Sequence, residues 1–223
     1  MDVKLNRKYF ENHDLKGPII AIAVGVLLLF AGAAVPGLAI AVIGGGWLYF
    51  SINTTTDEEY DKSVQSNIPD LRSRALQKLG VDEDEVKEID PIVISGYRFK
   101  GASKFKKGAD DKWRTNRYEA VVLYFSPREV HCYTYSFITT DSTVQEQTDV
   151  YFYRDIVTVS TSSESETVTD AKTGKRETAN YESFVLRTTG GNALSVAIDA
   201  GNSDSVQRSI NAMRQLLRQK KDE

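Results

Sequence analysis

The sequence predicts an α+β fold, in which an N-terminal transmembrane helical hairpin and a helical connector precede antiparallel strands closed by a C-terminal helix. Three observations predict it: a charge-free apolar run at residues 18–50, helix start and stop signals between residues 56 and 80, and strand-like patterns from residue 91 to residue 198. With 41% hydrophobic and 26% charged residues among 223, a mostly disordered chain is excluded. We expect an N-terminal segment (1–17), the hairpin (18–51), the connector (52–90) and a β domain (91–223).

The apolar run is too long for one perpendicular membrane span. Its 33 residues would extend about 50 Å as one helix, against a hydrocarbon core of about 30 Å. Pro36 and Gly37 lie near its middle and favour a reversal between two short helices, at about 18–34 and 38–51. One long, tilted or kinked helix and a signal peptide cleaved near Ala31-Gly32-Ala33 are the alternatives.

Flanking charge predicts the orientation of this hairpin. Basic residues precede it, whereas Asp57-Glu58-Glu59 follow it, so the N-terminus is expected inside the cell. Two spans would bring the chain back to the cytoplasmic side. This predicts a cell-membrane protein with both termini and the β domain in the cytoplasm. Aromatic residues near the ends of the run are expected to be membrane-interface anchors, with core packing as the alternative for each: Tyr9, Phe10, Trp47 and Tyr49.

The connector carries clear helix signals. Thr56 is a predicted N-cap, Pro69 restarts the helix, and Gly80 is a stop signal. Beyond it, strands are predicted at 91–99, 118–125, 130–138, 149–160, 180–188 and 193–198, with a polar hairpin between Glu164 and Tyr181. A C-terminal helix follows, with an apolar stripe of Val206, Ile210, Met213, Leu216 and Leu217.

This order of antiparallel strands and one C-terminal helix resembles the pleckstrin-homology (PH)-like domains. The resemblance covers about 88–220, and Tyr153-Arg154-Asp155-Ile156 is similar to a Tyr-x-Asp-Ile pattern of bacterial PH-like membrane proteins. It implies a strongly bent sheet, a PH-like β-barrel or sandwich, closed at one end by the helix. It also implies a domain that binds other molecules and catalyses no reaction.

The segment 98–117 is strongly basic, with eight Lys or Arg residues against two Asp residues. In the PH-like order it connects the first two strands, where lipid-binding relatives place basic residues against phosphorylated head groups. The resemblance therefore implies a lipid-binding site, with a mobile solvated loop as the alternative. The expected contacts are Lys104, Lys106, Lys107 and Arg114, with Phe105 or Trp113 inserted at the interface.

The sequence offers no catalytic residues, metal ligands or cofactor motif. His131 and Cys132 are neighbours in a predicted strand, so they point to opposite faces, and the only other histidine is His13. A net charge of −3 gives no general attraction to nucleic acid. We therefore expect neither an enzyme nor a nucleic-acid-binding protein.

The leading hypothesis is a membrane-anchored, non-enzymatic interaction or scaffold protein that binds a protein partner or assembles with itself. The alternative is an anionic-lipid-sensing module that uses the basic segment 98–117, with the bilayer as its partner.

Overall fold

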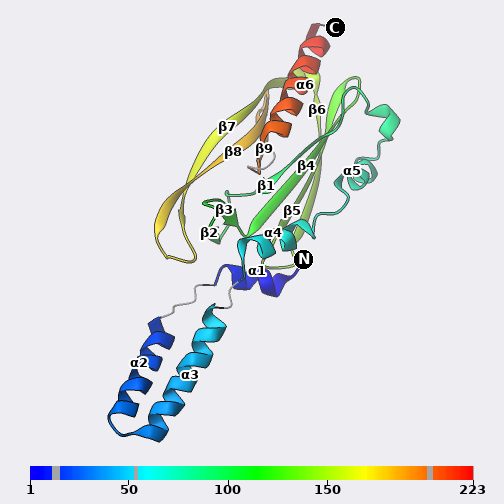
Figure 1. Ribbon diagram of the computed structural model, residues 1–223. Helices are drawn as coiled ribbons and strands as arrows, with labels where there is room; N and C mark the ends of the chain where they lie inside the picture. The colour runs from blue at the N-terminus through cyan, green and yellow to red at the C-terminus, as the bar shows by residue number, and fades with distance from the viewer. Residues whose placement is uncertain (12–15, 53–54, 200–202, 223) are drawn as a thin grey trace.

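The computed structural model describes residues 1–11, 16–52, 55–199 and 203–222. Within these residues, five α-helices precede the strands and a sixth follows them (Figure 1). The helices are α1 (Val3–Tyr9), α2 (Lys16–Phe30), α3 (Ala34–Ile52), α4 (Asp57–Gln65), α5 (Leu71–Leu79) and α6 (Ser203–Asp222). The strands are β1 (Ile92–Tyr97), β2 (Phe105–Lys107), β3 (Trp113–Thr115), β4 (Arg117–Phe125), β5 (Glu129–Ile138), β6 (Val144–Phe152), β7 (Ile156–Thr169), β8 (Arg176–Thr188) and β9 (Gly191–Ala197).

The strands form three antiparallel sheets. The four-stranded sheet has the order β1-β4-β5-β6, the three-stranded sheet has the order β7-β8-β9, and β2 and β3 form a two-stranded sheet. Of the predicted PH-like β-barrel or sandwich, the barrel is therefore wrong, because the described strands divide into separate sheets instead of forming one continuous ring. The turn Tyr153–Asp155 separates β6 from β7, so the strand predicted at 149–160 is in fact the end of one sheet and the start of another.

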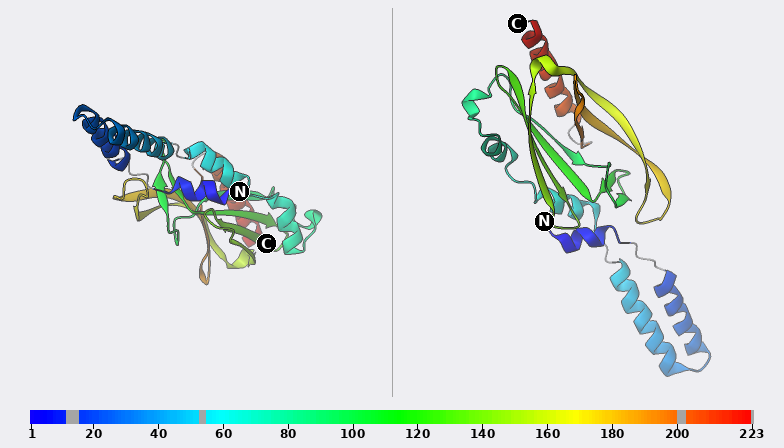
Figure 2. Two further views of the ribbon diagram at one scale, coloured as in Figure 1. Left: turned by 90° about the horizontal axis from the view of Figure 1, so that it is seen from below. Right: turned by 180° about the vertical axis from the view of Figure 1, so that it is seen from behind.

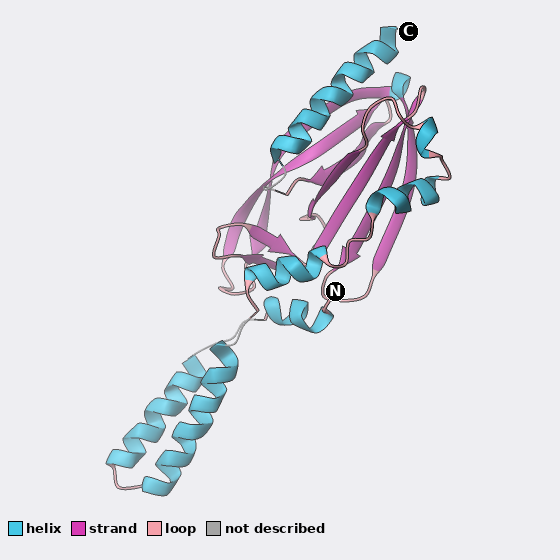
Figure 3. Ribbon diagram, turned by 45° about the vertical axis from the view of Figure 1, so that its right-hand side comes forward, coloured by secondary structure: helices cyan, strands magenta, loops and turns pink. Residues whose placement is uncertain are grey.

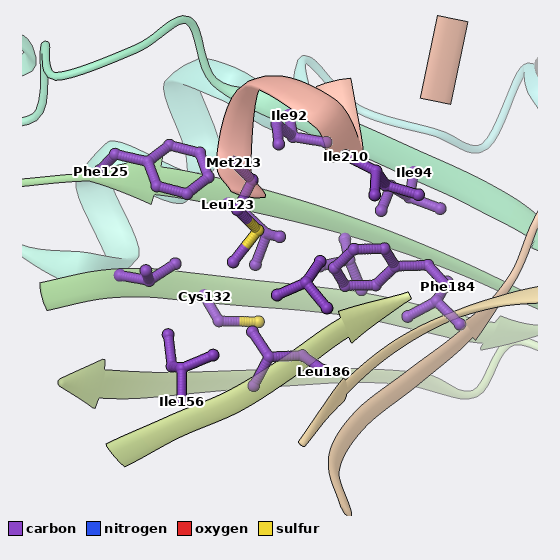
Figure 4. Packing of buried hydrophobic residues seen from close by; sticks show 14 of the residues in the cluster. Ile92, Ile94, Leu123, Phe125, Cys132, Ile156, Phe184, Leu186, Ile210 and Met213 are labelled. Atoms are coloured by element: carbon purple, nitrogen blue, oxygen red, sulfur yellow. The ribbon is translucent and has the colours of Figure 1, made fainter. Parts of the chain in front are cut away.

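The two faces of the four-stranded sheet are buried by different partners. Strand β4 is buried along almost its whole length, which explains its nearly continuous apolar sequence. Val121, Leu123 and Phe125 face the three-stranded sheet and α6, where they meet Phe184 and Ile210 (Figure 4). The stripe predicted on α6 is buried in this core, as expected.

The opposite face of this sheet is covered by helices, as Figure 3 shows for α4 and α5. Thr56 caps α4 in a capping box with Glu59, and Gly80 ends α5 in the left-handed conformation, so both helix signals are confirmed. Helix α1 was not predicted. It packs here too, through the stacked rings of Tyr9 and Tyr60, whose centroids are 4.2 Å apart.

Helices α2 and α3 form a close antiparallel pair that projects from the body (Figure 1). Gly25 makes the approach possible, because a Cβ there would lie 2.6 Å from the backbone nitrogen of Ala41. Gly32, with φ of +84°, forms the turn between them. Pro36 lies in the first turn of α3, where an N–H would have no intrahelical partner.

The predicted membrane span is wrong. Among the described residues, no helix combines the length and the apolar character that a membrane crossing requires. Helix α2 has 15 residues, which rise about 22 Å, less than a hydrocarbon core of about 30 Å. The predicted cell-membrane localisation, with both termini and the β domain cytoplasmic, depended on that span. It is therefore contradicted as well.

The predicted membrane-interface anchors lie in two different settings. Tyr9 and Phe10 are buried against Tyr60, so for these two the alternative of core packing is the correct one. Trp47 and Tyr49 are exposed on α3, and the Trp47 ring passes close to Gly17 of α2.

Candidate binding site between the β2–β3 hairpin and the β7–β8 arm

The basic segment 98–117 folds as an ordered hairpin. Strands β2 and β3 pair across a turn in which Asp111 has φ of +61°. The Gly108 N–H donates to the Lys112 carbonyl oxygen, and the Lys112 N–H donates to the Asp110 carboxylate. These bonds close a short turn, so part of the segment for which a mobile solvated loop was the alternative is an ordered hairpin.

Arg114 on β3 is the centre of an ion-pair cluster. Its guanidinium donates to both carboxylate oxygens of Asp61 at 2.7–2.8 Å, and to both oxygens of Asp110 at 2.9–3.0 Å. A fifth bond reaches the Lys112 carbonyl oxygen at 3.5 Å, so all five donors are used. Hydrogen bonding from Arg114 lowers the pKa of Asp110 to about 2. Because the Arg114 side chain is only 5% exposed, it cannot reach a lipid head group without breaking this cluster.

Lys106 on β2 connects the hairpin to α1. Its ammonium group donates to the Tyr9 carbonyl oxygen at 2.9 Å and lies 3.8 Å from the centroid of the Tyr9 ring. Burial lowers the pKa of Lys106. The Tyr9 hydroxyl donates to Asp57 at 2.6 Å, and the Ala109 N–H donates to the same carboxylate. Burial alone would raise the pKa of Asp57, but these hydrogen bonds lower it.

The long β7–β8 hairpin, here called the arm, bends toward the β2–β3 hairpin and is fastened to it at its tip (Figure 2). The Asp170 carboxylate accepts hydrogen bonds from the backbone N–H groups of Lys107, Lys172 and Thr173. The Ala171 N–H donates to the Phe105 carbonyl oxygen at 2.7 Å. Asp170 is 2% exposed, and although burial alone would raise its pKa, these backbone donors lower it.

A pocket of about 600 Å³ lies beneath the fastened arm. Its aromatic lining comes from β1, β3 and β8 and from the chain that follows β1: Tyr97, Phe99, Trp113 and Tyr181. Phe99 and Tyr181 are stacked, with ring centroids 4.1 Å apart. Its charged lining consists of Asp61, Asp110, Asp111, Glu182, Asp199, Lys112 and Arg114, which gives a formal charge of −3. The pocket therefore combines apolar rings with an excess of carboxylates.

The structure brings the predicted lipid contacts into this region but gives them different surroundings. Lys104 is exposed, Lys106 and Lys107 are half-buried, and Arg114 is enclosed. Trp113 lies against the small core of Phe99, Val168 and Ala179 and lines the pocket. Asp61 was not predicted as part of this site, because it precedes Arg114 by 53 residues and no local pattern links the two.

The described residues that were considered as catalytic groups or metal ligands do not line this pocket. His131 and Cys132 have opposite orientations on β5, and burial raises the pKa of the Cys132 thiol to about 12, which keeps it protonated. His13 lies outside the described residues. Within the ranges that the structure describes, no group of three or more His, Cys, Asp or Glu side chains could hold a metal ion.

Comparison with known proteins returned no matching family model, no matching curated protein and no matching solved structure.

Proposed function

We propose that this chain is a non-enzymatic interaction protein whose β domain binds a basic segment of a protein partner. The observation that carries the proposal is the pocket beneath the arm, which has aromatic walls and an excess of negative charge. Its volume falls within the range of about 300–1,000 Å³ that is typical of ligand sites. The resemblance to PH-like domains remains part of the proposal, since four antiparallel strands, three more and a final helix agree with the order that it implies.

Arg and Lys side chains match both properties of the pocket. Their aliphatic stems pack on apolar surface while the charged group remains near polar partners. Their cations are also attracted to aromatic faces, most strongly to that of tryptophan, and Trp113 is one of the residues that line the pocket. A carboxylate-bearing ligand would meet Asp110, Asp111 and Glu182, so it would be repelled.

Head-group binding by the basic segment, the alternative function, stays a prediction. The geometry favours the pocket over it, because Arg114 is enclosed by two carboxylates and Lys106 is directed toward Tyr9. Vesicles that contain phosphatidylserine provide the direct comparison with a basic peptide.

The test is calorimetric titration of the full-length chain with acetyl-Gly-Arg-Gly-Arg-Gly-amide. We expect binding, and none of a matched peptide with Glu in place of Arg. The double variant Asp111→Asn, Glu182→Gln should weaken binding about three- to tenfold, since exposed charges each contribute up to about 1 kcal/mol. Asn is well suited to the left-handed conformation at position 111.

The matched control neutralises two exposed acids remote from the pocket, Glu83→Gln with Glu85→Gln, and should leave binding unchanged. Equal binding of the Glu peptide, or equal loss in both double variants, would show that the pocket does not select a basic segment. Binding to phosphatidylserine vesicles without binding to the Arg peptide would favour the lipid function instead.

A further inference from the structure

Strand β6 is an open edge of the four-stranded sheet. It pairs with β5 in a continuous nine-residue register, and no hydrogen bond from the described part of the chain covers its other side. Natural edge strands are often protected by charged residues, especially lysine, by proline, by a bulge or by short length. The sequence of β6, Val-Gln-Glu-Gln-Thr-Asp-Val-Tyr-Phe, carries two acidic residues but no lysine or proline, and its nine residues pair with β5 without a bulge.

The hydrogen-bond pattern shows which backbone groups face outward. The Ile138 N–H donates to the Thr143 carbonyl oxygen, which makes these two residues a hydrogen-bonded pair at the start of the β5–β6 ladder. Hydrogen-bonded and non-bonded pairs alternate along an antiparallel ladder. The outward backbone N–H and C=O groups of β6 therefore belong to Val144, Glu146, Thr148, Val150 and Phe152.

We propose that this edge pairs with β6 of a second copy of the chain, antiparallel and centred on Thr148. In this register every outward residue meets an outward residue. Thr148 lies opposite its own counterpart, Glu146 opposite Val150, and Val144 opposite Phe152. All five residues on each strand then use both backbone groups, which amounts to about ten hydrogen bonds across the junction. The two sheets would join as one sheet of eight strands.

The side chains fit the same register. Val144, Val150 and Phe152 are 44–47% exposed and lie on the same face of β6, since alternate residues of a strand share a face. Pairing places Val144 against Phe152 at both ends of the junction, an aromatic and β-branched contact that favours sheets. Asp149 falls opposite Gln147, and Glu146 opposite Val150, so no two like charges face each other.

The experiment measures the mass of the full-length chain by sedimentation over a range of concentrations. We expect a reversible dimer. Thr148→Pro removes two central hydrogen bonds of the junction, one from each copy, but none from the β5 ladder, because the Thr148 N–H faces outward. The dissociation constant of its dimer should rise at least about tenfold, while its melting temperature stays near that of the parent chain.

A charge exchange tests the register without proline. Thr148→Lys and Thr148→Glu should each weaken the dimer when alone, since like charges then lie opposite each other, and an equal mixture should form the heterodimer. A monomer at all concentrations would overturn the proposal. So would a dimer whose stability is the same in all three variants, because association would then occur through another surface, such as the apolar α2–α3 pair.

Discussion

Replacing Arg114 by methionine should destabilise the fold, because it removes the cation at the centre of the cluster. The Arg114 side chain is 5% exposed, and its five donors satisfy Asp61, Asp110 and one carbonyl oxygen. Removing one member of a fully buried ion pair costs about 3–5 kcal/mol. The Asp61 and Asp110 side chains are 37% and 41% exposed, so water can hydrate both carboxylates when Arg114 is replaced. We therefore expect a loss of about 2–3 kcal/mol, below the fully buried range.

For a chain of this length, that loss lowers the melting temperature by about 4–12 °C. Urea unfolding followed by circular dichroism measures it directly. Lys104→Met is the control: it changes the same charge on the same hairpin at an exposed position, and it should stay within about 0.5 kcal/mol of the parent chain. Arg114→Lys should fall between the two, because an ammonium group cannot make the paired contacts of a guanidinium. Equal stability of Arg114→Met and Lys104→Met would refute the structural role of the cluster.

Three further predictions address pH, helix packing and the core. The pKa of Asp110 in the folded chain, about 2, is below the unfolded value of about 3.9, so its contribution is complete above about pH 5 and is lost progressively as the pH falls to about 1; Asp110→Asn should flatten this part of a stability-versus-pH curve measured by urea unfolding. Gly25→Val should force α2 away from α3, seen as faster amide hydrogen exchange in both helices, whereas Gly45→Val meets open space and should leave the exchange rates unchanged. Ile210→Ala leaves a cavity in the core between the sheets and should cost about 2–4 kcal/mol in urea unfolding, and a loss below about 1 kcal/mol would contradict the packing of α6.

Local signals made the helical connector and the C-terminal helix predictable. Thr56 and Gly80 act within one turn of their helices, and the stripe on α6 depends only on the helical repeat. The break at Tyr153 was not predictable in the same way. Residues 149–160 are uniformly strand-like, and what separates β6 from β7 is burial of Tyr153, whose hydroxyl donates to the distant Ser126 carbonyl oxygen.

The candidate site was predicted only as a charge pattern. The basic character of 98–117 located the region, but a net charge does not specify which cations are buried. Arg114 is enclosed because Asp61 reaches it from α4, and the pocket exists because Asp170 fastens the arm. The membrane prediction had a similar weakness, since a run without charge does not show where each helix begins and ends, and α2 has only 15 residues.

The position of α1 has a consequence for the order in which the chain can fold. Its Asn6 side chain donates to the Thr139 carbonyl oxygen, and Arg7 donates to that of Thr140, so each bond joins groups 133 residues apart. During synthesis α1 emerges before β5 and β6, so its binding surface is incomplete until the β5–β6 turn has been made. Contacts of such long range are formed late, because the intervening chain must first be ordered. Until then Tyr9 and Phe10 remain without their core, which makes α1 a segment that a chaperone could meet before the rest of the domain closes over it.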